Sequence, residues 1–86
     1  MRSEDPCVQF GRRLRALRQE AGWSQEEMAH RAGLDRTYVS SCESGHRNVT
    51  LKTILRLSAA LDVEPTRLLQ DGNPGSSLSG KAIVKE

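Results

Sequence analysis

The segment from Ser24 to Gly45 constrains the fold of this chain more than any other, because it predicts two short helices joined by a tight turn. It opens with the sequence SQEE, which is typical of a capping box. In such a box the Ser24 hydroxyl accepts a hydrogen bond from the Glu27 amide, and the Glu27 carboxylate bonds the Ser24 amide in return. Trp23 and Met28 flank this cap as a hydrophobic staple. We therefore expect the first helix to begin directly after Ser24.

The end of this helix and the start of the next are marked by residues with special backbone preferences. Gly33 ends the first helix, because a left-handed backbone favours a residue without a Cβ atom. The Asp35 side chain is expected to cap the second helix, which runs to about Glu43 before Gly45 stops it. Two capped helices separated by so short a turn form the frame of a helix-turn-helix.

The helix-turn-helix segment divides into an apolar and a polar face. Ala29 lies midway along the first helix, where a small side chain lets the second helix approach closely. The other residues expected to face inward are Met28, Ala32, Leu34, Val39 and Cys42. Those left facing outward are Asp35, Arg36, Thr37, Ser40, Ser41 and Ser44.

Three further helices are predicted around this segment. The earliest covers residues 8–21 and ends at Gly22, and its apolar face consists of Phe10, Leu14, Leu17 and Ala21. Thr50 caps a helix over 51–61, whose inward stripe is predicted as Leu51, Ile54, Leu55, Ser58 and Leu61, flanked by Leu57. Glu64-Pro65 opens a short helix to about Gln70, since proline suits the first helical position. The pattern predicts an all-α domain of five helices.

The composition changes at residue 71, where Gly, Ser, Pro and Asn become frequent, as in turns and linkers. We expect an N-terminal arm over residues 1–7, a helical domain over 8–70 and a Gly/Ser-rich tail over 71–86. The final residues KAIVKE are compatible with a short strand, a dimerisation arm or loose chain.

The charge of the chain supports a nucleic-acid partner only through its distribution. Thirteen Lys and Arg against eleven Asp and Glu give a net charge of +2, which is a weak argument by itself. Basic residues gather locally, however, at Arg12, Arg13, Arg15 and Arg18 and again at His46 and Arg47. A local basic surface can bind phosphate on a nearly neutral molecule, although an arginine run alone is also typical of a solvated helix face.

Several functions are disfavoured by what the sequence lacks. No apolar run is long enough to cross a membrane and no signal segment precedes the helices, so a cytoplasmic location with reduced Cys7 and Cys42 is expected. His30 and His46 lack the spacing of metal ligands, and we expect neither a metal nor a cofactor. No nucleophile and base pair is evident, and 86 residues leave little room for a catalytic pocket, so an enzyme is not expected.

The residues RRLRALRQEAGWSQEEMAHRAGLDRTYVSSCESGHRNVTLKTILRLSAALDV resemble the Cro/C1-type (XRE-type) helix-turn-helix repressors. This family includes the small controller proteins of restriction–modification systems. The resemblance covers roughly residues 9–70. It implies a compact, lambda-repressor-like domain of five helices whose third helix reads double-stranded DNA, usually as a homodimer on an inverted repeat.

The resemblance also implies roles for individual residues. Base contacts fall on Arg36, Thr37, Ser40 and Ser41. Phosphate contacts are implied for Gln25, Ser44, His46, Arg47 and Asn48, and Tyr38 is assigned to a phosphate or a thymine methyl. Arg18 and Glu43 match a partly buried ion pair that orients two helices. Cys42 departs from the larger aliphatic residue usual at its position, which raises the question of a redox role. Because Cys42 is expected to face inward, a core thiol is favoured over a redox sensor.

The sequence thus predicts a sequence-specific transcriptional regulator that binds DNA as a homodimer. The dimer interface is assigned to apolar residues beyond the needs of one small core, namely Leu61, Val63, Leu68 and Leu69. A phage-type repressor, a restriction–modification controller and an antitoxin remain open as roles. The alternative from another class is a protein-interaction module on the same fold, and a toxin or a polymerase subunit is the protein partner considered.

Overall fold

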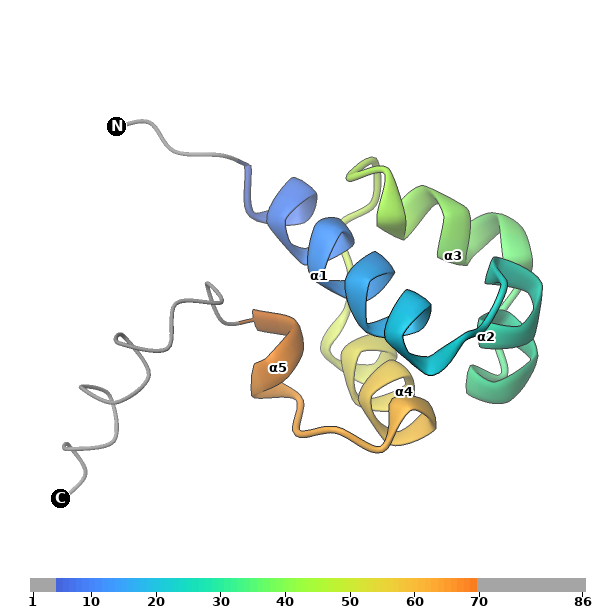
Figure 1. The fold of residues 1–86 in the computed structure, drawn as a ribbon. Coiled ribbons are helices and arrows are strands. Elements are labelled where there is room, and N and C mark those ends of the chain that lie inside the picture. Colours follow the sequence, from blue (N-terminus) through green and yellow to red (C-terminus); the bar gives the residue numbers. More distant parts are fainter. Residues whose placement is uncertain (1–4, 70–86) are drawn as a thin grey trace, which may run out of the picture.

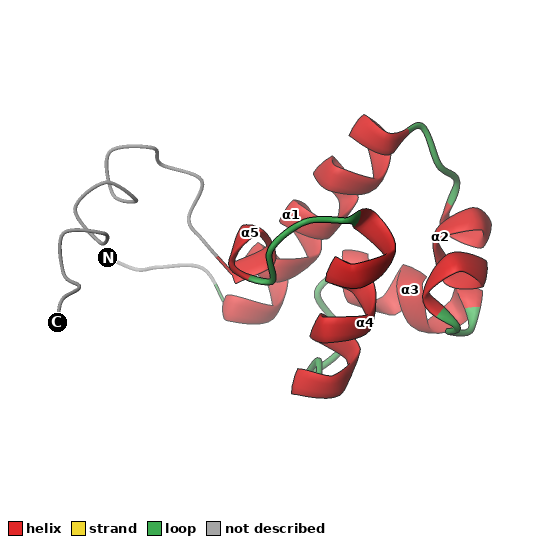
Figure 2. Cartoon of the chain, turned by 90° about the horizontal axis from the view of Figure 1, so that it is seen from below, coloured by secondary structure: helices red, strands yellow, loops and turns green. Residues whose placement is uncertain are grey.

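A computed structural model of the chain describes residues 5–69 as an all-helical domain. The helices are α1 (Pro6–Ala21), α2 (Gln25–Ala32), α3 (Arg36–Glu43), α4 (Leu51–Leu61) and α5 (Thr66–Leu69). Figure 2 shows these helices joined by short loops, and no strand occurs between residues 5 and 69. The predicted all-α class is confirmed. The end of the predicted last helix at Gln70 and the predicted tail strand or dimerisation arm lie outside the described residues.

The helix starts largely follow the local capping signals. The Ser24 hydroxyl accepts a hydrogen bond from the Glu27 amide at 3.0 Å, as predicted. The predicted return bond from the Ser24 amide to the Glu27 carboxylate is wrong, because this carboxylate instead accepts from Arg31 Nε at 2.6 Å, one turn along α2. Helix α1 begins two residues earlier than predicted, since the Asp5 carboxylate accepts a bond from the Cys7 amide at 2.8 Å.

The helix ends use left-handed residues, and one start differs from its prediction. Gly22 and Gly33 have φ values of 79° and 71°, which explains why glycine ends α1 and α2. Asp62 ends α4 at φ 61°, although no glycine marks this position in the sequence. Asp35 precedes α3 as predicted, but its side chain makes no capping hydrogen bond. The Asp35 carboxylate therefore stays at the surface beside the start of α3.

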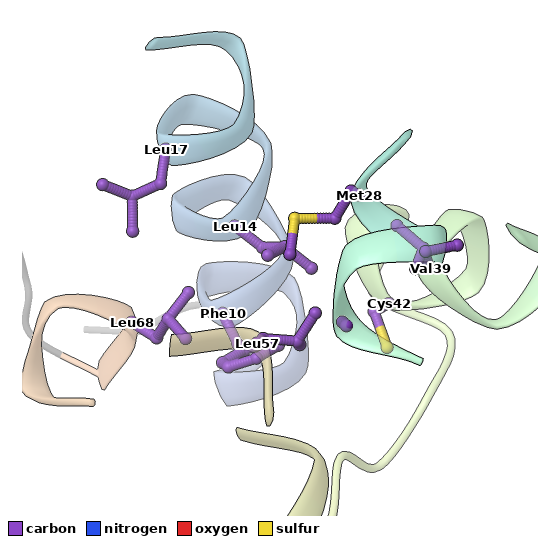
Figure 3. Packing of buried hydrophobic residues seen from close by; sticks show 10 residues of the cluster. Phe10, Leu14, Leu17, Met28, Val39, Cys42, Leu57 and Leu68 are labelled. Atoms are coloured by element: carbon purple, nitrogen blue, oxygen red, sulfur yellow. The ribbon is translucent and has the colours of Figure 1, made fainter. Parts of the chain in front are cut away.

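One hydrophobic core lies between the five helices, where α1 packs against α3 and α5, and α2 packs against α3 and α4. Figure 3 shows Leu14 and Met28 meeting at its centre, with Leu57 and Cys42 close by. The buried apolar residues are Phe10, Leu14, Leu17, Met28, Ala29, Ala32, Val39, Cys42, Leu57 and Leu68. The inward positions predicted for the helix-turn-helix are confirmed at Met28, Ala29, Ala32, Val39 and Cys42, and Leu34 is half-buried.

The inward stripe predicted for α4 is partly wrong. Leu51 and Leu55 are 70% and 48% exposed, whereas Thr53 and Leu57 are buried. The helix is rotated so that Thr53 accepts a hydrogen bond from the Tyr38 hydroxyl of α3 at 3.3 Å, and Leu57 enters the core. Two large leucines are consequently displayed to solvent at the first half of α4.

Helix α1 approaches the end of α3 backbone to backbone. A Cβ atom placed on Gly11 would lie 2.3 Å from the Cys42 carbonyl oxygen and 2.6 Å from that of Glu43. Only glycine fits between these backbones in this arrangement. Gly11 therefore sets how closely the last turn of α3 packs on the domain, a role that nothing in the sequence pattern indicated.

Candidate nucleic-acid interface

The outward face of α3 carries the residues predicted to read DNA bases. Arg36 and Thr37 are exposed, while Ser40 and Ser41 are half-buried. Val39 and Cys42, on the opposite face, are buried in the core. Within residues 5–69 the Arg36 and Thr37 side chains make no hydrogen bond or ion pair, so their donors are available to another molecule. An α-helix with unbonded polar side chains on its exposed face has the size and chemistry that suit a major groove.

The side chains of Arg18, Gln25 and Glu43 meet beside this face. Arg18 Nε and Nη2 donate to the two Glu43 carboxylate oxygens at 2.6 and 3.1 Å, so the predicted ion pair is present in the structure. Gln25 Nε2 donates to Glu43 Oε1 at 3.1 Å. Arg18 Nη1 also donates to the Trp23 carbonyl at 2.6 Å. The cluster ties α1, the turn after it, the start of α2 and the end of α3 together.

Tyr38 lies differently from its predicted role. Its hydroxyl donates to Thr53 Oγ1 at 3.3 Å, so the phenol points toward α4 and not outward. The Arg47 guanidinium carbon lies 4.5 Å from the centre of the Tyr38 ring, which is a cation–π distance. The ring thus supports Arg47, whose side chain is the one presented to solvent. The partner of the Tyr38 hydroxyl is 15 residues away in sequence, and the local pattern carried no signal for it.

The loop after α3 contains two groups that are already bonded inside the chain. The Ser44 hydroxyl donates to the Ser40 carbonyl at 3.0 Å, which commits its single hydrogen. His46 Nδ1 lies 3.2 Å from this hydroxyl. The Cys7 thiol donates to the Asn48 amide oxygen at 3.3 Å, so the Asn48 NH2 group is left to face solvent. Ser44 is therefore better described as a cap of α3 than as a phosphate donor.

Neither cysteine has the environment of a reactive thiolate. Burial raises the pKa of Cys42 to about 11, and Cys42 is part of the core, as expected. Desolvation, followed by the neighbouring Asp5 carboxylate, raises the pKa of Cys7. Among residues 5–69 no group of three His, Cys, Asp or Glu side chains could hold a metal ion. No described helix is long and apolar enough to cross a membrane.

The residues assigned to a dimer interface are only partly at the surface. Leu68 is fully buried in the core of the chain itself. Its assignment to the dimer interface is therefore wrong, because an interface residue must be exposed on the single chain. Leu61 and Val63 are half-buried, and Leu69 is 59% exposed. Leu51 and Leu55, which the sequence pattern predicts as core residues, are exposed as well.

A shallow pocket of about 180 Å³ opens beside Leu69. Its wall combines the start of α1, the loop before α4 and part of α4, through Pro6, Cys7, Phe10, Asn48, Val49 and Ile54. Its position at the end of α5 makes the exposed Leu69 part of a largely apolar depression.

The fold and this surface together define a helix-turn-helix domain, with a short exposed helix held against a compact helical body. The sequence matches the helix-turn-helix family over residues 14–68. The chain belongs to this family, in its Cro/C1 (XRE) type. A hypothetical transcription factor of Neisseria meningitidis is 48% identical over 56 residues, which are 65% of this chain and 53% of that protein. The chain thus spans about half the length of that relative.

Two solved structures support the same assignment. The restriction–modification controller protein C.AhdI of Aeromonas hydrophila is 55% identical, with a TM-score of 0.71, over 72% of this chain and 94% of its own. SinR, the master regulator for biofilm formation and a Bacillus subtilis protein, was solved in complex with DNA. That structure is 35% identical, with a TM-score of 0.68, over 71% of this chain and 98% of its own.

Proposed function

We propose that this protein is a sequence-specific transcriptional regulator that binds an inverted-repeat operator as a homodimer. The observation that carries the proposal is the outward face of α3, where the Arg36 and Thr37 side chains are exposed and uncommitted. Gln25 bonds Glu43 at the end of α3, and Arg47 stacks on Tyr38 near its start. A base-reading helix flanked by phosphate-binding groups is the arrangement that a helix-turn-helix uses on DNA.

Arg36 is the main base-reading residue in this proposal. Its guanidinium can donate two hydrogen bonds to guanine O6 and N7, which is the commonest specific contact in the major groove. Thr37 offers one hydroxyl and one methyl group to a neighbouring base pair. Ser40 and Ser41 contribute less, because both are half-buried.

The phosphate contacts are assigned to Gln25, His46, Arg47 and the Asn48 amide group. Arg47 is the permanently charged member of this set. Because its side chain already stacks on Tyr38, it loses less conformational freedom when it binds DNA. Tyr38 acts through Arg47, and Ser44 acts by capping α3. Phosphate contacts of this kind set the position of the protein on the duplex and carry no sequence information.

For the homodimer we propose the surface formed by Leu51, Leu55 and Leu69, with Leu61 and Val63 at its side as half-buried residues. Three large, exposed apolar side chains on one small domain favour burial against a partner. A second copy with two-fold symmetry would present two α3 helices to successive major grooves, about 34 Å apart.

The regulated system that we propose is restriction and modification. Support comes from the 55% identity to C.AhdI, which extends over 94% of that controller protein. A DNA partner implies a cytoplasmic location, and the reduced Cys7 and Cys42 fit that compartment. The action is binding without catalysis.

The proposal is tested by fluorescence anisotropy with DNA duplexes selected from a random pool and with a mixed-sequence duplex, at about 50 and 200 mM salt. We expect the selected duplexes to contain an inverted repeat and to bind at least about a thousandfold more tightly than the mixed sequence. Binding of both should weaken steeply with salt. Failure to bind any duplex at the lower salt concentration would overturn the proposal and favour the protein-interaction module.

A further inference from the structure

The Glu43 carboxylate is shared by two residues of different helices. Arg18 of α1 donates to both of its oxygens, and Gln25 of α2 donates to Oε1. We infer that Glu43 is a positioning residue for DNA binding, which orients the Gln25 amide so that an N–H group points at a phosphate. The inference rests on the proposed function, because it concerns how Gln25 is presented to DNA.

The chemistry of the contact determines which way the Gln25 amide faces. A carboxylate accepts hydrogen bonds and cannot donate them, so the amide group of Gln25 must turn its nitrogen toward Glu43. One N–H is used at 3.1 Å from Oε1, and the second N–H of the same nitrogen points away from Glu43. A DNA phosphate accepts hydrogen bonds only, and this second N–H is the group that suits it.

Arg18 neutralises the Glu43 carboxylate, which lies beside the proposed DNA surface. The Glu43 and Arg18 side chains are only 4% and 11% exposed, so the negative charge of Glu43 is largely withdrawn from solvent. An unpaired carboxylate near the DNA backbone would repel phosphate, whereas a carboxylate bonded twice to Arg18 is neutralised. Arg18 is itself held by the Trp23 carbonyl, just before α2 begins. The orientation of Gln25 therefore depends on a rigid support from two other elements.

The inference predicts that Gln25 and Glu43 act on DNA affinity as one unit. Gln25→Met keeps the side-chain length and removes both the hydrogen bond to Glu43 and the proposed hydrogen bond to phosphate. Glu43→Gln leaves one oxygen, which the 2.6 Å contact with Arg18 Nε takes, so the new NH2 group faces Gln25. The Gln25 amide must then turn its oxygen inward or lose the contact. The phosphate-directed N–H is displaced in either case.

The experiment measures the affinity of these two variants and their double mutant for a mixed-sequence duplex of about 24 base pairs, which spans two turns of DNA. We expect each single variant to bind about tenfold more weakly, the low end for a hydrogen bond to a charged group. The double mutant should also bind about tenfold more weakly, whereas independent effects would give about a hundredfold. Since Gln25 is neutral, the salt dependence of binding should be unchanged in the Gln25→Met variant. The matched control is Glu27→Gln, which makes the same change in the exposed pair with Arg31 and should leave affinity unaltered.

Thermal unfolding separates positioning from loss of structure. Glu43→Gln should lower the melting temperature in the Gln25→Met background as well as in the wild type, because the Arg18 pair is lost in both. If Glu43→Gln weakens DNA binding as much in the Gln25→Met background as in the wild type, the inference is overturned. A wild-type protein that binds no duplex would instead overturn the proposed function, and a Gln25→Met variant with wild-type affinity would overturn the phosphate contact and the inference together.

A measurement on the wild type keeps the inference testable if Glu43→Gln does not fold. In the nitrogen-15 spectrum, one Gln25 side-chain amide proton should exchange with water more slowly than those of the exposed Gln19. Its partner proton should shift when the duplex is added. Two Gln25 amide protons that exchange as fast as those of Gln19 would overturn the inference.

Discussion

Substitution of Gly11 by alanine tests the packing of α1 on the recognition helix. Gly11 lies inside α1, where alanine ordinarily stabilises a helix by about 1 kcal/mol relative to glycine. In this protein the added Cβ atom would lie 2.3 Å from the Cys42 carbonyl oxygen, whereas ordinary contacts begin near 3.4 Å. The neighbouring atoms are backbone and cannot rotate away, so α1 and the end of α3 must separate by about 1 Å.

The two effects oppose each other, and their sizes decide the sign. Overpacking a core costs about 1–3 kcal/mol where side chains can adjust, and the rigid backbone here puts the cost at or above the upper limit. After the gain in helix propensity, we expect Gly11→Ala to lower the free energy of unfolding by about 2 kcal/mol. For a domain of this size that corresponds to a fall of roughly 10 °C in melting temperature.

The assay is urea and thermal unfolding followed by circular dichroism at fixed protein concentration, since the proposed dimerisation would couple to stability. Ala16→Gly, at an exposed site of the same helix, is the control for helix propensity and should cost about 1 kcal/mol. A Gly11→Ala protein as stable as the wild type, or more stable, would refute the close approach of the two backbones.

Four further substitutions test other contacts. Arg47→Met should reduce the slope of log K against log salt by about 0.9, because it removes one charged phosphate contact, and an unchanged slope in a salt titration would contradict that role. Leu55→Lys should shift the protein toward monomer in analytical ultracentrifugation, whereas Ala16→Lys at an exposed site of α1 should not; equal behaviour of the two would argue against the proposed dimer surface. Leu57→Ala should lower the free energy of unfolding by about 2–5 kcal/mol in urea, as expected for a fully buried leucine, and a loss below about 1 kcal/mol would be inconsistent with its burial. Burial raises the pKa of Cys42 from 9.0 to about 11, so the unfolded chain loses its thiol proton before the native one does, and stability should decline as the pH rises above 9.0. The stability of Cys42→Val should decline less over that pH range. Parallel declines of the variant and the wild type would contradict the raised pKa of Cys42.

The helix boundaries could be predicted because their causes are local. The bond from the Glu27 amide to the Ser24 hydroxyl joins residues three apart, and Gly33 needs only its own backbone conformation. The inward positions of α2 and α3 followed from helical spacing for the same reason. Arg36 and Thr37 could be predicted as exposed because the opposite side of their helix is apolar.

The errors arose where contacts distant in sequence decide the outcome. The rotation of α4 depends on the Tyr38 hydroxyl meeting Thr53, and periodicity within α4 permitted a stripe that included Leu55. The same contact turned Tyr38 away from its predicted phosphate role. Gly11 looked like an ordinary residue of a helix, since the carbonyl groups that require glycine belong to Cys42 and Glu43, far along the chain.

The burial of Leu68 has a consequence for how the protein responds to its own abundance. Because α5 completes the core of each chain with this residue, a monomer has a closed interior of its own, and the proposed dimerisation would be a separate step that depends on concentration. When most copies are single, the number of pairs rises with the square of their total number. Operator occupancy would then stay low at first and increase sharply over a narrow range of cellular protein level.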